Sequence, residues 1–341
     1  MQNNLKYWKA SLVVLCLLIV ATAAEAASVA FFVGEVTAIR GGKKLPIKTG
    51  VVLQQGDEIL TGEKSTLELT YKDGSKVTIM ENSAAVVGSN DAKDSDNVAL
   101  IFGSIRGKFN KLSKDGTSKK VYTPTNICAI RGTEFNITVS RDGSSYIDLT
   151  EGNLNIKNHY GEEDITQGEK TETRMSQAPN KTQQQINSEE WLIEKDDELL
   201  KSPEKAVSRY RKHLENISSE TTEQSEYIQK YGNMVSSIDE KKQLEEIEFG
   251  IKNAEEIVLD DLISSQTIAD SINKLSNEFS GKDEKAFQSF EELKNEINKV
   301  TEQYRTNYKA IKAVKEEHQK AKKKILHRFQ DERGRIREGL H

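Results

Sequence analysis

Residues that could support catalysis or bind a metal are few in this chain, and their spacing follows no known catalytic pattern. Five histidines occur: His159, His213, His318, His327 and His341. None belongs to an HExxH pair or to another spacing that brings two metal ligands together. No Gly-x-Ser-x-Gly motif is present, and the stretch from Gly103 to Lys108 lacks the spacing of a phosphate-binding loop. The sequence therefore predicts a protein that is not an enzyme and that needs no cofactor or metal.

The chain has two cysteines, and neither indicates a disulfide or a reactive thiol. Cys16 lies inside an apolar stretch near the N-terminus, followed by further apolar residues rather than by a lipoprotein boundary. Cys128 stands between Ile127 and Ala129, where a buried thiol acts as a small hydrophobic side chain. A mature chain with one cysteine cannot form an internal disulfide.

The N-terminus has the three parts of a secretory signal. Lys6 and Lys9 give a positive start, residues 11–24 are almost wholly apolar, and Ala24-Glu25-Ala26 is typical of a signal-peptidase site. An apolar run of about 14 residues is shorter than the ~20 that span a bilayer. We therefore expect a signal peptide over residues 1–26, cleavage next to Ala26 or Ala27, and a periplasmic or otherwise extracytoplasmic protein. A retained membrane anchor is the alternative.

Residues 28–171 have the pattern of an all-β domain. Apolar and polar residues alternate from Thr66 to Tyr71, Asp73-Gly74-Ser75 makes a turn, and the alternation resumes at Val77. A second hairpin follows the same plan around Asp142-Gly143-Ser144. Turn residues every 8–12 positions are typical of a sandwich, a barrel or a short β-solenoid, and the pattern leaves these open.

A polar segment, residues 172–188, separates this domain from residues 189–341, which have helical composition. The segment is rich in Gln, Asn, Thr and Ser, so we expect a linker. Ser202-Pro203 is a helix start signal. Apolar residues recur at helical spacing from Phe290 to Ile325, interrupted by Asn307 and His318. The sequence predicts a long-helix bundle or coiled coil; such polar interruptions favour an intramolecular antiparallel bundle over a homodimer, which stays an alternative.

An ordered series of short motifs in the β half resembles the FecR-like domain family of exported bacterial proteins. The signature residues are Gly56, Asp57, Asp73, Gly74, Thr123, Pro124, Arg131, Gly132, Thr133, Phe135, Glu151 and Gly152. Each motif alone is weak, but the order, with Thr-Pro before Arg-Gly-Thr, is specific. The resemblance covers about residues 33–170, less than half of the chain.

The physical roles expected of the signature residues are structural. Gly132 should adopt a positive φ that lets the chain change direction. Asp57, Asp73 and Asp142 should accept hydrogen bonds that close turns. Arg131 lies between apolar residues, so its guanidinium is expected to be pinned by a carboxylate, with Glu134 and Glu151 as the candidates. Recognition of a partner's carboxylate by Arg131 is the alternative.

The resemblance implies a class of function without naming a ligand. Regulators of this family carry a cytoplasmic anti-sigma region before a membrane helix. Here about ten residues precede the apolar run, too few for such a domain. The favoured hypothesis is an exported, non-catalytic binding or signal-relay module that engages a protein or envelope ligand, with the helices mediating assembly. The alternative is a structural envelope protein whose helices bind the cell wall or a membrane surface.

Charge adds one observation about partners. The formal net charge is −5, so nothing in the composition requires a nucleic acid partner. Residues 320–328 are strongly basic, which suits a solvated helix end near the negative pole of the helix dipole. The alternative is a patch that touches anionic lipid or wall polymer.

Overall fold

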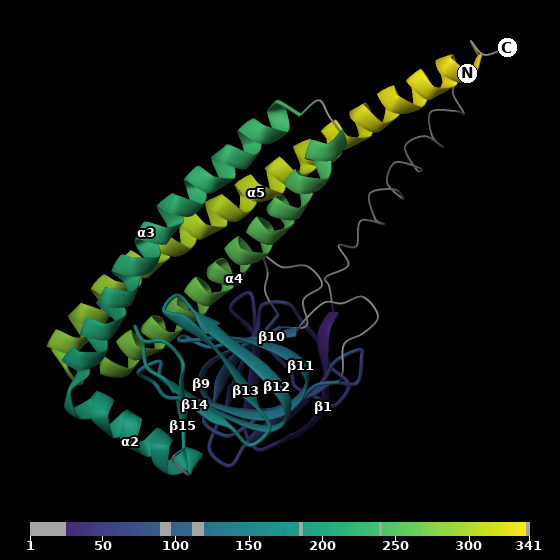
Figure 1. Ribbon diagram of the computed structural model, residues 1–341. Coiled ribbons are helices and arrows are strands. Elements are labelled where there is room, and N and C mark those ends of the chain that lie inside the picture. The colour runs from purple at the N-terminus through teal and green to yellow at the C-terminus, as the bar shows by residue number, and fades with distance from the viewer. Residues whose placement is uncertain (1–24, 89–96, 111–118, 184–186, 239–240, 339–341) are drawn as a thin grey trace, which may run out of the picture.

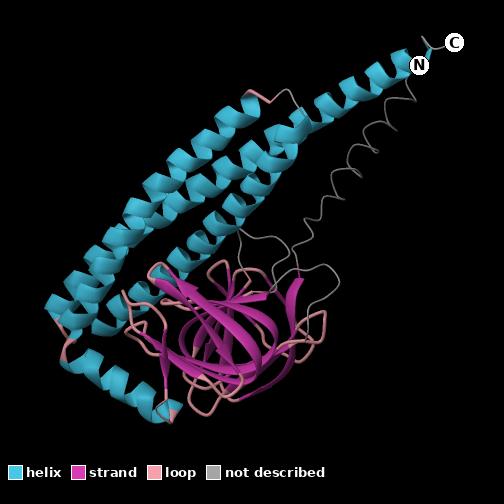
Figure 2. Ribbon diagram, in the orientation of Figure 1, coloured by secondary structure: helices cyan, strands magenta, loops and turns pink. Residues whose placement is uncertain are grey.

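The computed structural model describes residues 25–88, 97–110, 119–183, 187–238 and 241–338. The predicted signal residues 1–24 lie outside this part of the chain, and so does Cys16. The described residues form a β region followed by long helices (Figure 2). The expected segregated α+β architecture is therefore confirmed.

The β region contains fifteen described strands joined in a single hydrogen-bonded sheet. They are β1 (Glu25–Val33), β2 (Val36–Arg40), β3 (Lys43–Leu45), β4 (Val52–Gln54), β5 (Asp57–Thr61), β6 (Thr66–Thr70), β7 (Lys76–Ile79), β8 (Ala84–Val87), β9 (Val98–Lys108), β10 (Lys119–Tyr122), β11 (Ile127–Val139), β12 (Ser145–Asn158), β13 (Gly161–Thr166), β14 (Lys170–Thr173) and β15 (Asn180–Thr182). Both predicted hairpins are present, as β6–β7 and β11–β12.

The sheet curves around one aliphatic core. Inward-facing residues alternate along the strands, as Leu67 and Leu69 do on β6 and Ile137 and Val139 do on β11. Among the described strands, the only parallel pairing joins β9 to β10, and all other pairs are antiparallel. This pattern does not fit the short solenoid left open by the sequence, because stacked solenoid coils pair in parallel.

Two segments expected to lie outside the β domain are continuous with it. Ala26 and Ala27, the predicted cleavage residues, lie in β1 with buried side chains. At the other end, part of the expected linker belongs to the sheet: β14 pairs with β12, β15 pairs with β14, and Met175 is buried. A polar segment can form such an edge because only one face of each strand contacts the protein.

Four described helices follow: α2 (Ser188–Lys201), α3 (Pro203–Ser236), α4 (Lys241–Phe279) and α5 (Glu284–Glu338). Helix α3 begins at Pro203, as the start signal predicts, although the Ser202 side chain makes no capping hydrogen bond. Helices α3, α4 and α5 form an antiparallel bundle, and the C-terminal part of α5 extends past the other two (Figure 1). No described helix is both long enough and apolar enough to span a membrane.

The polar interruptions in the apolar stripe of α5 are satisfied inside this bundle. The Asn307 amide donates to the Thr221 carbonyl at 2.9 Å and accepts from the Ser225 hydroxyl at 2.8 Å. The His318 Nε2 atom lies 3.0 Å from the Leu244 carbonyl oxygen. These bonds join α5 to α3 and to α4. They explain how the stripe tolerates buried polar residues, since each has a partner.

Candidate functional site

The β region and the helices meet across a polar surface where α4 lies beside β9 and β10 (Figure 1). At its centre is the Asp260 carboxylate of α4, which is 2% exposed. It lies 2.8 and 2.9 Å from the Lys120 Nζ atom, and the Tyr122 hydroxyl donates to it at 2.8 Å. Lys157 adds a fourth contact at 3.0 Å. Three β-region side chains thus converge on one helical carboxylate.

The electrostatics of this group keep Lys120 charged beside the Asp260 carboxylate. Burial opposes the charge of Lys120, but the carboxylates of Asp260 and Glu256 outweigh burial and raise the pKa of Lys120. Burial and the Asp260 charge raise the pKa of Tyr122 well above its usual value. The lysine is therefore a cation and the tyrosine a neutral donor throughout the physiological range.

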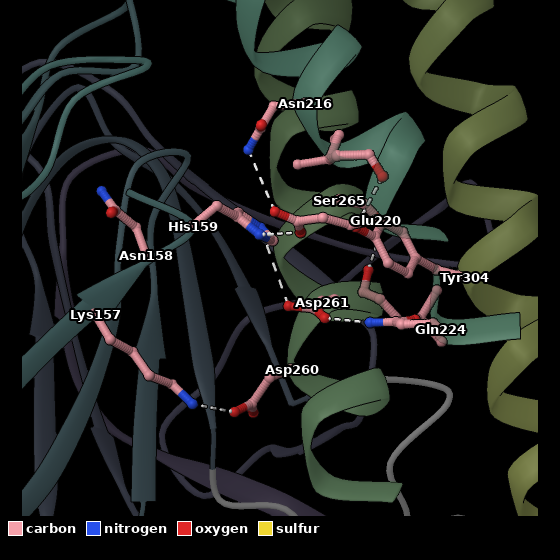
Figure 3. A network of polar contacts seen from close by, with 12 residues as sticks. Lys157, Asn158, His159, Asn216, Glu220, Gln224, Asp260, Asp261, Ser265 and Tyr304 are labelled. Carbon is pink, nitrogen blue, oxygen red and sulfur yellow. Dashed lines mark hydrogen bonds and ion pairs between the residues drawn. The ribbon is translucent and has the colours of Figure 1, made fainter. Parts of the chain in front are cut away.

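A second group, centred on a histidine, lies beside the first (Figure 3). His159, just after β12, contacts the Glu220 carboxylate of α3 at 2.5 Å and lies 4.0 Å from Asp261 of α4. Burial opposes the charge on His159, but Glu220 and Asp261 outweigh it and raise the pKa of the imidazole. Burial also raises the pKa of Asp261, to about 6, while His159 opposes that rise and Gln224 donates to the carboxylate. This group can change charge near neutral pH.

A neighbouring histidine behaves in the opposite way. His213 of α3 is 3% exposed, and its Nδ1 atom lies 3.0 Å from the Tyr160 hydroxyl. Burial and the nearby charge of His159 lower the pKa of His213 to about 3, so this imidazole is neutral. Its Nε2 atom and the Asn126 Oδ1 atom are buried without a hydrogen-bond partner among the described residues. Both residues line a cavity of about 100 Å³ between the sheet and the helices.

The signature Thr-Pro turn forms the β side of this cavity. The Thr123 hydroxyl accepts from the Asn126 amide N–H at 2.9 Å, which closes the turn between β10 and β11. Pro124 and Asn126 then face residues of α3 and α4 across the cavity. This signature element therefore supports the contact between the two regions as well as the hairpin.

A second contact joins the regions at the far end of the β11–β12 hairpin. Asp142 closes its turn as predicted, since its carboxylate accepts from the Ser144 amide at 2.9 Å. The same carboxylate also receives the Arg209 guanidinium of α3 at 2.8 Å. Arg141 reaches Glu278 of α4 at 2.5 Å. Both ends of the hairpin are thus held by the helices.

The other two predicted turn aspartates act within the β region. Asp57 accepts from the Gln54 amide at 2.8 Å and forms a two-pronged pair with Arg40. Asp73 accepts from Ser75 at 3.0 Å and pairs with Lys119 at 2.6 Å. Their turns contain Gly56 and Gly74, which have φ of 82° and 81°. These four residues thus shape two turns of the β region.

The bulge in the middle of β11 and β12 confirms one expectation and corrects another. Gly132 has the predicted positive φ, at 63°, and Gly152 opposite has 92°. The Arg131 side chain, however, is exposed, and among the described residues it has no ion pair. Glu134 instead pairs with Arg106 at 2.6 Å and with Lys108 at 3.2 Å. Alternation along β11 explains the difference, because Arg131 points away from the core that buries Ile130.

The remaining signature residues lie on the same ladder. Phe135 is fully buried and stacks on Phe109 with ring centroids 5.7 Å apart. Thr133 is buried, whereas Glu151 is exposed. Cys128 is buried as predicted, and burial raises the pKa of its thiol to about 12. Among the residues that the structure describes, no cluster of three or more His, Cys, Asp or Glu side chains could hold a metal.

Sequence reasoning missed the residues that join the two regions. Lys120, Lys157, Asp260 and Glu220 lie in ordinary charged stretches, and His159 belongs to no motif. The Lys120–Asp260 pair joins residues 140 positions apart. The only available signal was a lysine and a tyrosine close to the Thr-Pro turn, which by itself does not identify a partner.

Comparison with known proteins agrees with the resemblance noted from the motifs. Residues 57–155 match the model of the family described as FecR protein. Two crystal structures of a proposed anti-sigma factor from Parabacteroides distasonis ATCC 8503 are similar, each with 16% identity and a TM-score of 0.32. The alignment covers 37% of this chain and spans 58% of that protein. A search of curated proteins gave no match.

Proposed function

We propose that this chain, whose residues 57–155 form a FecR-type region, is an exported, non-catalytic signal-relay module. The β region engages a protein or another envelope component, and the helices mediate assembly with further partners. The FecR match is the observation that carries the proposal. Residues 57–155 include eleven of the twelve signature residues, all except Gly56.

The contacts between the two regions supply a physical route for a relay. Lys157 with Asp260, and Asp142 with Arg209, connect opposite ends of the β11–β12 hairpin to the helices. A ligand that bends or straightens this hairpin would alter both contacts together, since packed elements shift as units. Binding at the β region can thereby change how the helices are held.

The exposed bulge is the surface that we assign to the ligand. Arg131 is exposed and unpaired within the described chain, while Gly132 and Gly152 hold the backbone beneath it in a defined shape. An arginine presented in this way suits a carboxylate on a protein partner. This is the second of the two roles considered for Arg131.

Affinity capture from the native cell envelope with the full tagged chain tests this assignment. We expect one specific partner to be recovered by the native chain and lost when Arg131→Glu reverses the charge. Lys48→Glu is a matched control, because Lys48 is exposed and lies away from the bulge. Equal recovery by all three proteins would rule out the bulge as the binding surface.

A structural role in the envelope is the second candidate, favoured by the projecting end of α5. Lys320, Lys323 and Lys324 are on this part of the helix, together with the partly exposed Leu326 and Phe329. Co-sedimentation with peptidoglycan and with anionic vesicles separates the two candidates. A structural protein should pellet through α5, and the triple change of these lysines to Gln should release it.

Export itself is tested by the mature N-terminus. We propose cleavage next to Ala26 or Ala27, within the first residues of β1. N-terminal sequencing of protein from the cell envelope should begin there. A chain that retains Met1 would instead support the membrane anchor.

A further inference from the structure

A second polar cavity, outside the site described above, also lies between the sheet and the helices. It measures about 370 Å³ and is bounded by β5, β8 and β9 on one side and by α4 and α5 on the other. Its lining includes Glu58, Asp270, Thr301, Val86 and Ala99. It is separate from the His159 group, with which it shares none of its lining residues.

Two carboxylates line this cavity without a salt bridge to any described residue. Asp270 of α4 is partly buried, and Glu58 of β5 lies across from it. Neither forms a hydrogen bond or an ion pair with a side chain in the described ranges. Burial and then the Glu58 charge raise the pKa of Asp270 to about 6, and Lys274 only partly offsets them. Arg305 also lines the cavity but pairs with Glu302.

An independent observation comes from the opposite wall. Thr301 of α5 is 7% exposed and lines the same cavity, yet its hydroxyl has no hydrogen-bond partner among the described residues. Buried hydroxyls are nearly always hydrogen-bonded in native proteins, so an orphaned one indicates a group that is not part of the chain. The hydroxyl can accept from an N–H donor as the carboxylates do.

We propose that this cavity binds a small organic cation with primary ammonium groups, such as a diamine or polyamine. Asp270 and Glu58 neutralise the ammonium charge, Thr301 supplies a further acceptor, and Val86 and Ala99 contact the methylene chain. A bare metal ion fits less well, because the cavity holds a molecule of several atoms and its carboxylates form no ligating cluster.

Isothermal titration of the full chain with putrescine and spermidine, at physiological salt, tests the proposal. We expect one saturable site for at least one of the two amines. The uncharged 1,4-butanediol and MgCl₂ should give no comparable heat. Asp270→Asn should weaken amine binding by about tenfold or more, since a hydrogen bond to a charged group is lost. Thr301→Val should weaken it by a smaller factor.

Thermal unfolding without ligand separates a binding role from a structural one. Asp270→Asn should leave the melting temperature unchanged or raised, because it removes a partly desolvated charge, and should reduce the stabilisation by amine in proportion to the loss of affinity. Glu246→Gln, at an exposed position on the same helix, is the control and should behave as the native chain. Absence of saturable amine binding, or equal binding by Asp270→Asn, would overturn the proposal. Neither outcome bears on the Arg131 surface.

Discussion

The ends and the middle of the β11–β12 hairpin are built on different principles. At its ends the hairpin is held by two charged contacts to helices more than 60 residues away in sequence, Lys157 with Asp260 and Asp142 with Arg209. In its middle, the bulge has positive φ at Gly132 and Gly152 and carries the exposed side chains of Arg131 and Glu151. The same hairpin therefore has two ends that are anchored to the helices and a middle that leaves a surface free.

The anchored end is itself divided into two parts with different sensitivity to pH. Asp260 pairs with Lys120 and Lys157. Burial opposes the charge of Lys120, but Asp260 and Glu256 outweigh burial and raise its pKa, so this pair keeps its charge throughout the physiological range. The neighbouring carboxylates of Asp261 and Glu220 lie next to His159. A histidine can lose its charge within the physiological pH range. Adjacent residues of one helix thus make one permanent and one titratable contact with the β region.

The largest expected effect is at the permanent contact. Asp260→Ala leaves the buried Lys120 with only the exposed Glu256 as counter-charge and removes the acceptor of Tyr122, so we expect a loss of about 3–5 kcal/mol in the free energy of unfolding. Guanidinium denaturation followed by circular dichroism measures it. The double variant Lys120→Met, Asp260→Leu should recover most of the loss, because well-packed apolar residues replace a buried pair at little cost. A single variant as stable as the native chain would show that this contact does not anchor the helices.

The next effect belongs to the bulge and sharpens the contrast with its ends. A Cβ at position 152 would lie 2.6 Å from the Gly132 carbonyl oxygen, at a φ of 92°. Gly152→Ala should therefore lower the free energy of unfolding by about 2–4 kcal/mol. Gly168→Ala is the matched control, since Gly168 has φ of 83° and open space around it. It should cost only the conformational part, about 1–2 kcal/mol, and equal losses would argue against the predicted clash.

The titratable contact should give a pH-dependent loss. The pKa of His159 is raised in the folded state, so its contribution is fully present below the unfolded pKa of about 6.5 and disappears as the pH rises through the folded value. His159→Gln should thus cost about 1.5–3 kcal/mol near pH 6 and much less near pH 9. Urea denaturation across this range tests the trend.

Two other groups in this contact act at the acid end of this range, so the part of the trend above about pH 7 belongs to His159. The pKa of His213 is lowered to about 3, so it opposes folding only as the pH falls below about 6.5. Asp261, with its pKa raised to about 6, favours folding as the pH falls toward 4. The exposed His327 pairs within its own helix, and His327→Gln should show no such trend. If the stability difference between the native chain and His159→Gln does not change with pH, the two contacts do not differ in their sensitivity to pH.

The smallest effect is expected at Arg131. Because its side chain is exposed and unpaired within the described chain, Arg131→Ala should change the free energy of unfolding by less than about 0.5 kcal/mol. Arg40→Ala, which removes the two-pronged pair with buried Asp57, is the comparison and should cost more. Thermal melts of both variants suffice. A large decrease in the free energy of unfolding for Arg131→Ala would instead support the structural role that the sequence context of Arg131 predicts.

Features with a local cause were predictable from sequence. The hairpin turns at Asp73 and Asp142, the positive φ of Gly132 and the start of α3 at Pro203 each depend on a few adjacent residues. The burial of Cys128 follows from its apolar neighbours. The error at Arg131 arose because apolar neighbours on a strand point to the opposite face from the residue between them.

By itself, the sequence determined two regions of different secondary structure, a FecR-type series of turns and a long helix with a polar-interrupted apolar stripe, because periodicity and turn chemistry act over short stretches. Only the tertiary structure decided that Asn307 and His318 are satisfied within one chain, that the polar segment after residue 172 joins the sheet, and that Asp260 meets Lys120. These contacts join residues dozens to more than a hundred positions apart, or, at the sheet edge, depend on a neighbouring strand. The residues adjacent to a charged residue in sequence do not indicate which distant residue will pair with it.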